Sequence, residues 1–437
     1  MCDVLIVGMG RTGKSLLSFF AARGAKKILV FDDKEKSADF GYPQIVEHVD
    51  HKNLDWKKVR NVFVSPGIPI KYPFCHEIVS FAIQNGCKLT NDVQFFLDLL
   101  EGKIAVGITG TNGKSTTTAM ISHILGNNFI SVGNIGRPVM EHINDGVGYI
   151  IELSSYQLEM CSDLPLSSAV LLDITPDHMD RYASLDDYVK AKVRIFDNLE
   201  TTAIVALNSC VNKRIFSELS NRRKIGMSVT EMLNQGFSMI GNTIYENSRE
   251  ILTIPRSVVQ FQENLLAAFV CTRLYNISEE EFFRKIISFK SLPHRTEKCG
   301  SYKNVTFVND SKATNIESLQ KAISLYSGSN LYLLAGGREK HKNAVGDSES
   351  LKGVKKAYFF GEAAQNFAMA QSGSLEYKVF RRFKDAFLGS VSDALASSDE
   401  IVILLSPGCS SFDEFKNFEE RGDYFKGMVR SLLGQPH

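Results

Sequence analysis

Residues 107–117 read GITGTNGKSTT, and this stretch predicts how the middle of the chain folds and what it binds. The apolar run before it has the composition of a buried strand, and the run after it has the pattern of a helix. Backbone N–H groups at the start of a helix point outward, and the helix dipole favours an anion at that end. Lys114 can reach the terminal phosphates of a nucleotide, and the hydroxyl groups of Ser115 and Thr116 can bind Mg²⁺. The stretch therefore predicts an ATP site.

The spacing of this loop departs from the strict phosphate-loop pattern, which would place a glycine where this chain has Ile108. A lysine, a serine and a threonine that open a helix after a buried strand still favour an ATP site over a chance glycine-rich turn. The predicted ATP-binding loop consists of Gly110, Thr111, Asn112, Gly113, Lys114, Ser115 and Thr116.

Oxygen ligands for a metal follow two later apolar runs. Glu152 ends the first run, and Asp173, Asp177, His178 and Asp180 follow the second. The carboxyl ends of parallel strands form the usual ligand face of an open α/β sheet. A single glutamate at a strand end is more often a cap, and a single histidine is more often a core residue. A cluster on successive strands after a phosphate loop instead indicates metal and phosphate handling.

A second glycine loop stands near the start of the chain, in VLIVGMGRTGKS at residues 4–15. Gly8, Gly10 and Gly13 have the dinucleotide-binding spacing, and Asp32 ends the next apolar run. Taken alone, this pattern predicts NAD or NADP.

Three series of alternating strands and helices predict an α/β protein of three domains, in line with about 150 residues per domain. We expect an N-terminal Rossmann-like domain (1–92), a central domain with a parallel sheet of the phosphate-loop ATPase type (93–291) and a C-terminal Rossmann-like domain (292–437). The last helix is predicted from Phe412 onward.

The bulk composition excludes several classes of protein. The net charge of +1 over 437 residues gives no broad surface for a polyanion. The eight cysteines form no CxxC pair, which indicates reduced thiols and no zinc site. Neither a signal peptide nor an 18-residue apolar run is visible, so we expect a cytoplasmic protein.

Seven motifs occur in order along the chain: GTNGKST, ELSSYQL, DITPDHMDRY, YVKAKVRIF, LPHRTE, NDSKATN and LLSPGCSSFDEFKNFEERG. Together they resemble the Mur ligases of peptidoglycan synthesis, and within them the enzymes that add D-glutamate. The resemblance implies an ATP-dependent amide ligase of cell wall biogenesis that acts on UDP-N-acetylmuramoyl-L-alanine and D-glutamate. The substrate carboxylate would attack the γ-phosphate to give an acyl phosphate, which the amine of D-glutamate would then attack. The resemblance implies no nucleic-acid partner, and we expect a monomer.

The same resemblance implies the catalytic residues Lys114, His178 and Lys192. Ser115 and Glu152 would bind one Mg²⁺, and His178 and Lys192 would serve a second. Lys192 would be carbamylated by CO₂, which turns a cation into an anionic oxygen ligand. From the residues alone, Lys192 could instead belong to a solvated basic face with its helical neighbours.

Further nucleotide contacts implied by the resemblance are Asn264, Arg295 and Asp310. The family pattern in the central helix is His-Asn-x-x-Asn, where this chain has Gln260 and Phe261 at the first two positions. Gln260 or Gln262 could substitute there. Asp173 stands where the family commonly has Asn.

Two substrate sites are also implied by the resemblance. A dianionic amino acid needs a lysine and several N–H or O–H donors, although the two phenylalanines could instead be core positions. The D-glutamate residues would be Lys312, Thr314, Lys340, Ser411, Phe412 and Phe418. The UDP-substrate residues would be Arg11, Thr12, Asp32, Asp33, Lys34, Ser65, Pro66, Gly67 and Asn134.

Three alternatives remain open. An NAD-dependent oxidoreductase would explain the opening loop but not the second loop or Glu152. A folylpolyglutamate-type or another Mur-type ligase would share the ATP chemistry, but the former usually lacks such an N-terminal domain. A nucleotide-binding scaffold would bind ATP without turnover.

Overall fold

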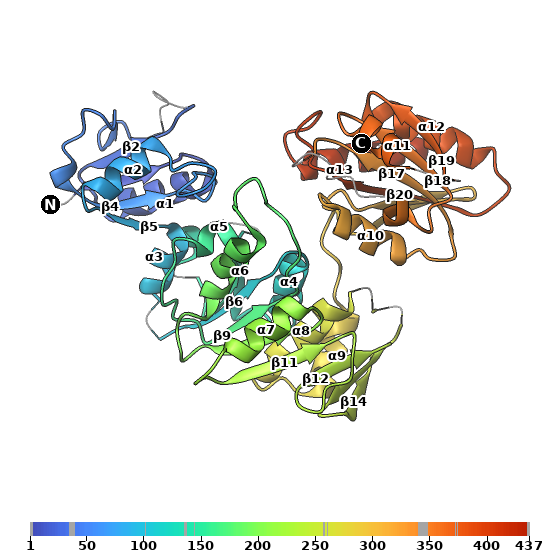
Figure 1. The fold of residues 1–437 in the computed structure, drawn as a ribbon, viewed down its shortest axis with the longest axis horizontal. Helices are drawn as coiled ribbons and strands as arrows, with labels where there is room; N and C mark the ends of the chain where they lie inside the picture. Colours follow the sequence, from blue (N-terminus) through green and yellow to red (C-terminus); the bar gives the residue numbers. More distant parts are fainter. Residues whose placement is uncertain are drawn as a thin grey trace. The chain divides into compact units, whose positions relative to one another are not determined.

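The computed structural model describes residues 3–34, 40–100, 102–134, 138–143, 145–256, 258–259, 261–339, 348–371, 373 and 375–434, with only the backbone of Asp3 and Ser348. The chain divides into two compact units, Met1–Phe289 and Lys290–His437, which are described one at a time (Figure 1).

The first unit begins with a five-stranded parallel sheet in the order β3-β2-β1-β4-β5. The chain runs outward from β1 to β3 and then returns to β4, so the loop after β1 lies at a topological switch point, where α/β sheets bind ligands. The strands are β1 (Asp3–Val7), β2 (Ile28–Phe31), β3 (Val46–His48), β4 (Val59–Val64) and β5 (Lys88–Thr90). The helices are α1 (Arg11–Ala22), α2 (Glu77–Gln84) and α3 (Asp92–Asp98), with a short 3-10 helix η1 (Trp56–Lys58).

A nine-stranded sheet follows in the same unit, in the order β14-β13-β12-β11-β10-β9-β6-β8-β7. Its strands are β6 (Ile104–Thr109), β7 (Phe129–Gly133), β8 (Gly148–Glu152), β9 (Ser168–Leu171), β10 (Thr202–Ala206), β11 (Lys224–Ser228), β12 (Phe237–Ile240), β13 (Thr243–Glu246) and β14 (Arg249–Thr253). Its helices are α4 (Lys114–Leu125), α5 (Ser155–Leu158), α6 (Leu185–Val193), α7 (Cys210–Glu218), α8 (Gln262–Arg273) and α9 (Glu279–Ile287), with η2 (Val139–His142) and η3 (Arg194–Phe196).

Apolar side chains cover both faces of this second sheet. Helices α4, α8 and α9 pack on one face, and α6 and α7 pack on the other. The apolar cluster on the face covered by α6 and α7 continues through η2 to α1 and α3. It reaches Ile6 and Phe63 of the first sheet. One continuous apolar core therefore joins the two sheets into a single unit.

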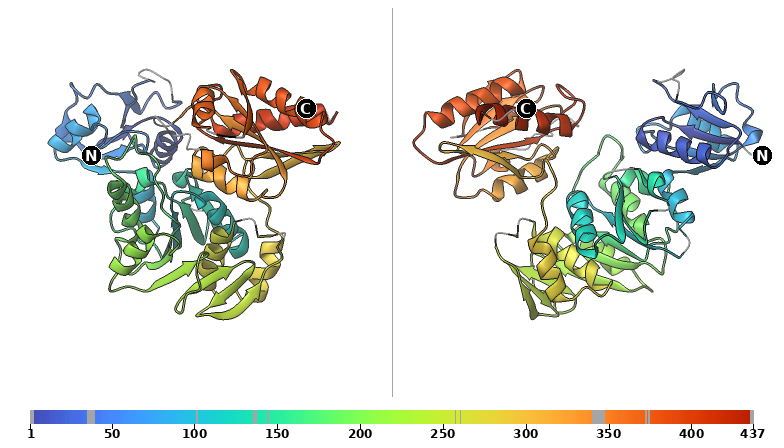
Figure 2. Two further views of the ribbon diagram at one scale, coloured as in Figure 1. Left: turned by 45° about the vertical axis from the view of Figure 1, so that its right-hand side comes forward. Right: turned by 180° about the vertical axis from the view of Figure 1, so that it is seen from behind.

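The second unit contains a six-stranded sheet in the order β15-β16-β20-β17-β18-β19. The strands are β15 (Glu297–Tyr302), β16 (Val305–Asn309), β17 (Asn330–Gly336), β18 (Lys356–Phe360), β19 (Glu376–Phe380) and β20 (Ile401–Gly408). The helices are α10 (Ile316–Ser324), α11 (Ala364–Ala370), α12 (Phe383–Leu395) and α13 (Phe418–Leu432), with η4 (Ser348–Leu351). Helices α10 and α11 pack on one face and α12 and α13 on the other (Figure 2).

The α/β class with mostly parallel sheets is confirmed, and two details of the prediction are wrong. The last helix begins at Phe418 instead of Phe412, because the side chain of Asn417 accepts a hydrogen bond from the backbone N–H of Glu420 and caps the helix there. The central sheet is not wholly parallel, since β12, β13 and β14 are antiparallel. In the last sheet β15 is likewise antiparallel to β16.

Each predicted domain segment contains one sheet, although the first two sheets share a compact unit. The division into three domains stays a prediction. Among the described helices, none combines the length and apolar character needed to cross a membrane.

Candidate active site

The loop between β6 and α4 requires glycine at two positions. Gly110 has φ +149° and Gly113, the N-cap of α4, has φ +82°, both in the region that disfavours other residues. A Cβ atom on Gly110 would lie 2.6 Å from the Cβ of Leu172, and one on Gly113 would lie 2.6 Å from the Oδ1 of Asn264. Asn264, the predicted nucleotide residue of α8, also donates a hydrogen bond to the Gly113 carbonyl at 3.4 Å. The loop is thus held between β9 and α8.

Two lysines converge on this loop. The Nζ of Lys114 lies 3.0 Å from the carbonyl oxygen of Gly110 and 2.7 Å from that of Thr111. The Nζ of Lys192, which α6 supplies, lies 2.7 Å from the same Gly110 oxygen. The start of α4, where Ser115 is buried, adds the positive end of a helix dipole. Lys114 and the start of α4 therefore supply the positive potential that a nucleotide phosphate needs.

Lys192 is a buried amine whose side chain is only 1% exposed. Burial, together with the nearby charge of Lys114, holds the pKa of Lys192 well below its ordinary value, while Asp177 and Glu152 oppose this shift. The ammonium form is costly in such a site because a buried charge loses its hydration. A larger fraction of Lys192 is therefore neutral and nucleophilic at ordinary pH than of an exposed lysine.

Helix α6 has two different sides. Tyr188 and Lys192 are buried, and the Nζ of Lys192 lies 4.6 Å from the centre of the Tyr188 ring. Lys190 and Arg194 instead line a cavity on the outer side. The interpretation of Lys192 as part of a solvated basic face is therefore wrong, although it fits these two neighbours.

Glu152 ends β8 beside these lysines and is 2% exposed. Its Oε1 accepts a hydrogen bond from Asn134 Nδ2 at 2.8 Å, whereas its Oε2 is buried and has no hydrogen-bond partner among the described residues. A buried carboxylate oxygen of this kind suits a cation, and Mg²⁺ prefers oxygen ligands. Within the described ranges, no three His, Cys, Asp or Glu side chains cluster to hold a metal. A cation beside Glu152 would therefore also need oxygen ligands from hydroxyl groups, from a phosphate or from a carbamylated lysine.

His178 is a further predicted residue of this site, and its backbone has φ +58°. Its backbone N–H donates to Asp177 Oδ1 at 2.8 Å, and its Nδ1 lies 2.8 Å from the hydroxyl of Tyr156. The His178 ring is 6.3 Å from the Tyr188 ring that underlies Lys192. His178 and Lys192 are thus brought to one side of the phosphate loop, as predicted residues of one site should be.

The sequence departs from the family pattern at Asp173 and at Gln260-Phe261, and the structure describes the surroundings of the first more fully than those of the second. Asp173 accepts a hydrogen bond from the Ser209 hydroxyl, which also caps α7, and its backbone N–H donates to Glu263 at 2.7 Å. Asp173 therefore connects β9 to α7 and α8. Gln260 lies outside the described residues, and Phe261 is the N-cap of α8.

The loop after β1 is tightly packed. A Cβ atom on Gly13 would lie 2.1 Å from the carbonyl oxygen of Gly8, so α1 begins directly against the loop. The carboxylate of Asp32 accepts hydrogen bonds from the backbone N–H groups of Met9 at 2.7 Å and Lys34 at 2.9 Å. Asp32 therefore holds the loop itself, a role that its sequence position does not reveal.

The remaining predicted UDP-substrate residues divide between two places. The Ser65 hydroxyl donates to the Gly8 carbonyl at 2.7 Å, which places Ser65, Pro66 and Gly67 beside the opening loop. Arg11 and Thr12 start α1, and Asp33 lies 3.0 Å from His76. Asn134 instead hydrogen-bonds Glu152, so the structure groups it with the central loop.

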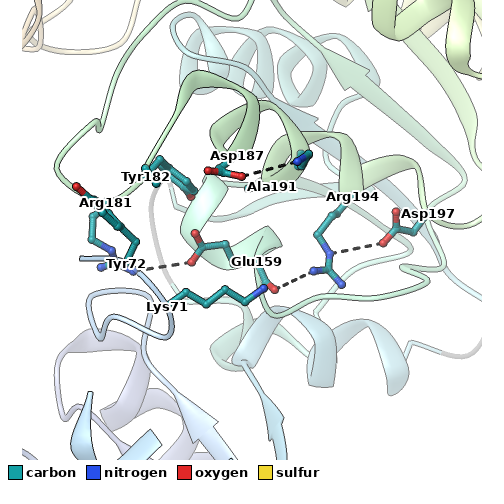
Figure 3. A pocket seen from close by; sticks show the side chains of 11 residues that line it. Lys71, Tyr72, Glu159, Arg181, Tyr182, Asp187, Ala191, Arg194 and Asp197 are labelled. Carbon is teal, nitrogen blue, oxygen red and sulfur yellow. Dashed lines mark hydrogen bonds and ion pairs between the residues drawn. The ribbon is translucent and has the colours of Figure 1, made fainter. Parts of the chain in front are cut away.

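Among the described residues, the first unit contains two cavities, and the predicted UDP-substrate residue Asp33 lines one of them. One of about 560 Å³ is lined by Phe31, Asp33, His51, Phe74, His76 and Phe81, among others. Another of about 590 Å³ lies between the segment at Lys71 and the outer side of α6 (Figure 3). There Glu159 lies 3.9 Å from Arg181, and Asp197 lies 3.6 Å from Arg194. Arg181, Lys190 and Arg194 of this cavity belong to the motifs DITPDHMDRY and YVKAKVRIF, although the motifs alone do not indicate a cavity.

In the second unit, Asp310 follows β16 and is 7% exposed. It accepts hydrogen bonds from the Thr296 N–H at 3.1 Å and the Ser406 hydroxyl at 2.9 Å. Burial raises the pKa of Asp310 to about 7, although these hydrogen bonds and the charge of Arg295 oppose the rise. The predicted nucleotide residues Arg295 and Asp310 therefore interact electrostatically.

The predicted D-glutamate residues lie at the ends of neighbouring strands. The Nζ of Lys312 lies 3.9 Å from the centre of the Phe418 ring, while Ser411 is buried. Phe412 is 60% exposed and so is not a core residue. Thr314 is half-buried two residues after Lys312. Lys340 lies outside the described residues.

Comparisons with known proteins show which family the chain resembles over most of its length. Residues 2–90 match the Mur ligase MurD-like N-terminal domain, and residues 108–272 match the Mur ligase middle domain. The chain is 35% identical to the UDP-N-acetylmuramoylalanine--D-glutamate ligase of Rickettsia prowazekii, across 96% of each chain. It is 34% identical to the enzyme of the same name from Caulobacter vibrioides, across 98% of this chain and 96% of that one.

Solved structures share the fold at low identity. The UDP-N-acetylmuramate-alanine ligase MurC of Thermotoga maritima has a TM-score of 0.60 at 15% identity, with 99% of this chain and 100% of that chain covered. The MurF ligase of Thermotoga maritima in complex with ADP has a TM-score of 0.59 at 14% identity, with 99% and 96% covered.

Proposed function

The chain belongs to the Mur ligase family, and from this premise we propose that it joins D-glutamate to UDP-N-acetylmuramoyl-L-alanine with hydrolysis of ATP to ADP. The observation that carries the proposal is the convergence of Lys114 and buried Lys192 on one loop carbonyl, beside the unpartnered oxygen of Glu152. The relatives named for this reaction match nearly the whole chain. We place the reaction in cytoplasmic peptidoglycan precursor synthesis and expect the chain to act as a monomer.

The family consists of ATP-dependent amide ligases that use Mg²⁺. Bound Mg²⁺ neutralises phosphate charge and so lowers the repulsion between two anionic reactants. In our proposal Ser115 and Glu152 hold one ion, and His178 and Lys192 serve a second. The buried Oε2 of Glu152 supports the first assignment.

The proposed reaction has two steps. A carboxylate oxygen of the acyl substrate attacks the γ-phosphorus, the bond to the ADP oxygen breaks, and an acyl phosphate forms. The amine nitrogen of D-glutamate then bonds to the acyl carbon, gives up a proton, and phosphate leaves with its bridging oxygen. Lys114 stabilises the negative charge on the transferred group, because an ordered cation in a site of low dielectric constant requires no reorganisation during the reaction.

We propose that CO₂ carbamylates Lys192. The neutral amine is the form that attacks CO₂, and burial together with Lys114 favours that form. The product is an anion beside the cation of Lys114, so a site that disfavours an ammonium gains an attractive pair of charges. This exchange supports the modification and supplies the oxygen ligands that an amine lacks.

The amino-acid site is proposed at Lys312, Thr314, Lys340, Ser411, Phe412 and Phe418. Lys312 lies over the Phe418 ring, which limits its rotamers and directs one cation toward a carboxylate. Exposed Phe412 is available to contact a ligand.

The UDP moiety is proposed at the loop after β1, where the packed start of α1 presents backbone N–H groups to a diphosphate. The aromatic cavity beside Asp33 is suited to the uracil, since Phe31, Phe74 and Phe81 line it. Asp32 also positions this loop through its hydrogen bond from the Met9 N–H, and we keep it among the proposed UDP-substrate residues.

The test of the function is phosphate release in parallel reactions that contain ATP, Mg²⁺, UDP-N-acetylmuramoyl-L-alanine and one amino acid each. Release should require D-glutamate and should stop when the UDP substrate is omitted. Equal turnover with L-alanine or a diamino acid would contradict the D-glutamate assignment. ATP binding without turnover on any amino acid would favour a scaffold.

The carbamate has its own test. Lys192→Ala should abolish turnover, with partial rescue by acetate, whereas Lys190→Ala, an exposed lysine of the same helix, should leave it intact. With ¹³C-bicarbonate, the wild type and Lys190→Ala should each show a carbamate carbon signal that Lys192→Ala lacks. Full activity of Lys192→Ala would remove this lysine from the mechanism.

A further inference from the structure

Three loops of the second unit carry the proposed D-glutamate residues, and they follow three adjacent strands. The loop after β16 contains Lys312, the loop after β17 leads to Lys340, and the loop after β20 contains Ser411. In the sheet, β20 lies between β16 and β17. The position of a small dianion in such a site depends on the spacing between these loops.

One side chain of α13 connects two of the loops directly. Arg421 is fully buried, with 0% exposure. Its Nε donates to Ser311 Oγ at 3.0 Å, and its Nη2 donates to the carbonyl oxygens of Ser311 at 2.9 Å and Cys409 at 3.1 Å. Ser311 directly precedes Lys312, and Cys409 stands two residues before Ser411.

The third loop packs against the same guanidinium. A Cβ atom on Gly337, the residue after β17, would lie 3.1 Å from Arg421 Nη1 and 2.2 Å from the Ser410 carbonyl. The backbone of Arg338 exchanges two hydrogen bonds with Ser410, at 2.9 and 3.0 Å. The absence of a side chain at Gly337 thus lets the β17 loop approach both Arg421 and the β20 loop.

The chemistry of Arg421 is unusual for a purely structural residue. Within the described ranges no carboxylate lies within 4.0 Å of it as an ion-pair partner, although the charge of Asp413 acts on it from further away, and its Nη1 has no hydrogen-bond partner. A buried guanidinium loses much hydration energy, and an apolar side chain of similar volume would often stabilise a fold as well or better. What the guanidinium adds is a rigid planar fork that binds several acceptors in fixed directions.

We propose that Arg421 is a positioning residue for D-glutamate: its fork fixes the loops after β16 and β20 relative to each other, so that Lys312 and Ser411 meet the substrate together. The inference rests on the proposed function. Arg421 does not contact the substrate, and it acts through the two backbone carbonyls that it holds.

The test compares the full-length enzyme with Arg421→Lys, Arg421→Met and the control Val429→Ala in steady-state phosphate release. Val429 is a buried residue two turns further along α13, so its truncation destabilises the same packing without reaching the loops. Arg421→Met should raise the KM for D-glutamate at least ~10-fold, because three charge-assisted hydrogen bonds are lost. Arg421→Lys should raise it less, since one ammonium can still bind a carbonyl. The KM for UDP-N-acetylmuramoyl-L-alanine should change less than ~2-fold.

The outcomes separate the two proposals. If wild type does not use D-glutamate, the proposed function fails before the variants are compared. If wild type uses D-glutamate but both Arg421 variants keep its KM, or raise it no more than Val429→Ala does, the positioning role is wrong. Loss of the folded state in both Arg421 variants, seen by circular dichroism, would assign the residue to stability and overturn the proposal as well.

Discussion

Replacing Asp310 with asparagine should remove a pH-dependent loss of stability from the second unit. The carboxylate is buried, and its partners are the Thr296 N–H and the Ser406 hydroxyl. An asparagine can accept from Thr296 and donate to the Ser406 oxygen, so the hydrogen bonds survive the change. The ionisable group alone is removed.

The magnitude follows from the pKa of Asp310, which burial raises to about 7, against about 3.9 in an unfolded chain. Between these values the folded state binds more protons than the unfolded state, so stability falls as pH rises from about 4 to 7 and then stays level. At about 1.36 kcal/mol per pKa unit, the wild type should lose roughly 2.5 kcal/mol between pH 5 and pH 8 through this group. Asp310→Asn should not show that loss.

The assay is urea unfolding of both proteins at several pH values. The single tryptophan, Trp56, lies in the first unit, so its fluorescence reports that unit, while circular dichroism reports both. The stability difference between the proteins should grow with pH in the circular dichroism transition and stay constant in the Trp56 transition. Ser406→Ala, which removes a hydrogen bond that lowers the pKa, should move the step to higher pH. The reasoning would be refuted if the difference in unfolding free energy between the wild type and Asp310→Asn stayed constant within ~0.5 kcal/mol across this pH range.

Three further predictions concern the first unit. Gly113→Ala should destabilise it by about 2–3 kcal/mol, because alanine is strained at this left-handed φ and its Cβ would contact Asn264. The KM for ATP should also rise. An unchanged urea midpoint in the Trp56 fluorescence transition would contradict this prediction. Ser209→Ala should lower the free energy of unfolding of the first unit by about 1–2 kcal/mol, because the N-cap of α7 and the partner of Asp173 are lost together. Asp173→Asn should keep most of the phosphate-release activity if Asp173 only connects β9 to α7 and α8. Removal of Mg²⁺ with a chelator should abolish phosphate release without moving the Trp56 midpoint, and persistent turnover would exclude the proposed metal role.

Local patterns predicted much of the fold and the central loop. The loop GITGTNGKSTT combines a strand, special glycines and a helix start in one continuous stretch, so its structure depends little on distant residues. The antiparallel strands β12–β14 also had a local signal that the prediction omits. Gly241 and Asn242 form a two-residue link between β12 and β13, and a Gly-Asn pair between two apolar runs is typical of a hairpin.

Long-range contacts explain what the sequence could not predict. Lys192 stands in a basic stretch, but in the fold it is buried and donates to the Gly110 carbonyl, 82 residues earlier. Arg421 belongs to the charged run NFEERG and gives no sign of burial. Asp32 has the position of a ribose ligand, yet its carboxylate binds its own loop. In each case the role depends on which partner the fold brings close.

The carbonyl of Gly110, shared by two lysines, has a consequence for mutagenesis. The charge of Lys114 is one of the causes that lower the pKa of Lys192, after burial, so the two residues are not independent. Lys114→Ala would remove a phosphate ligand and, at the same time, make Lys192 more basic and slower to react with CO₂. Genetically, the two positions should be epistatic: the double variant should lose less activity than the product of the two single losses. In the proposed mechanism, a defect at Lys114 would therefore reflect phosphate binding and carbamylation of Lys192 together, and the double-mutant cycle would separate them.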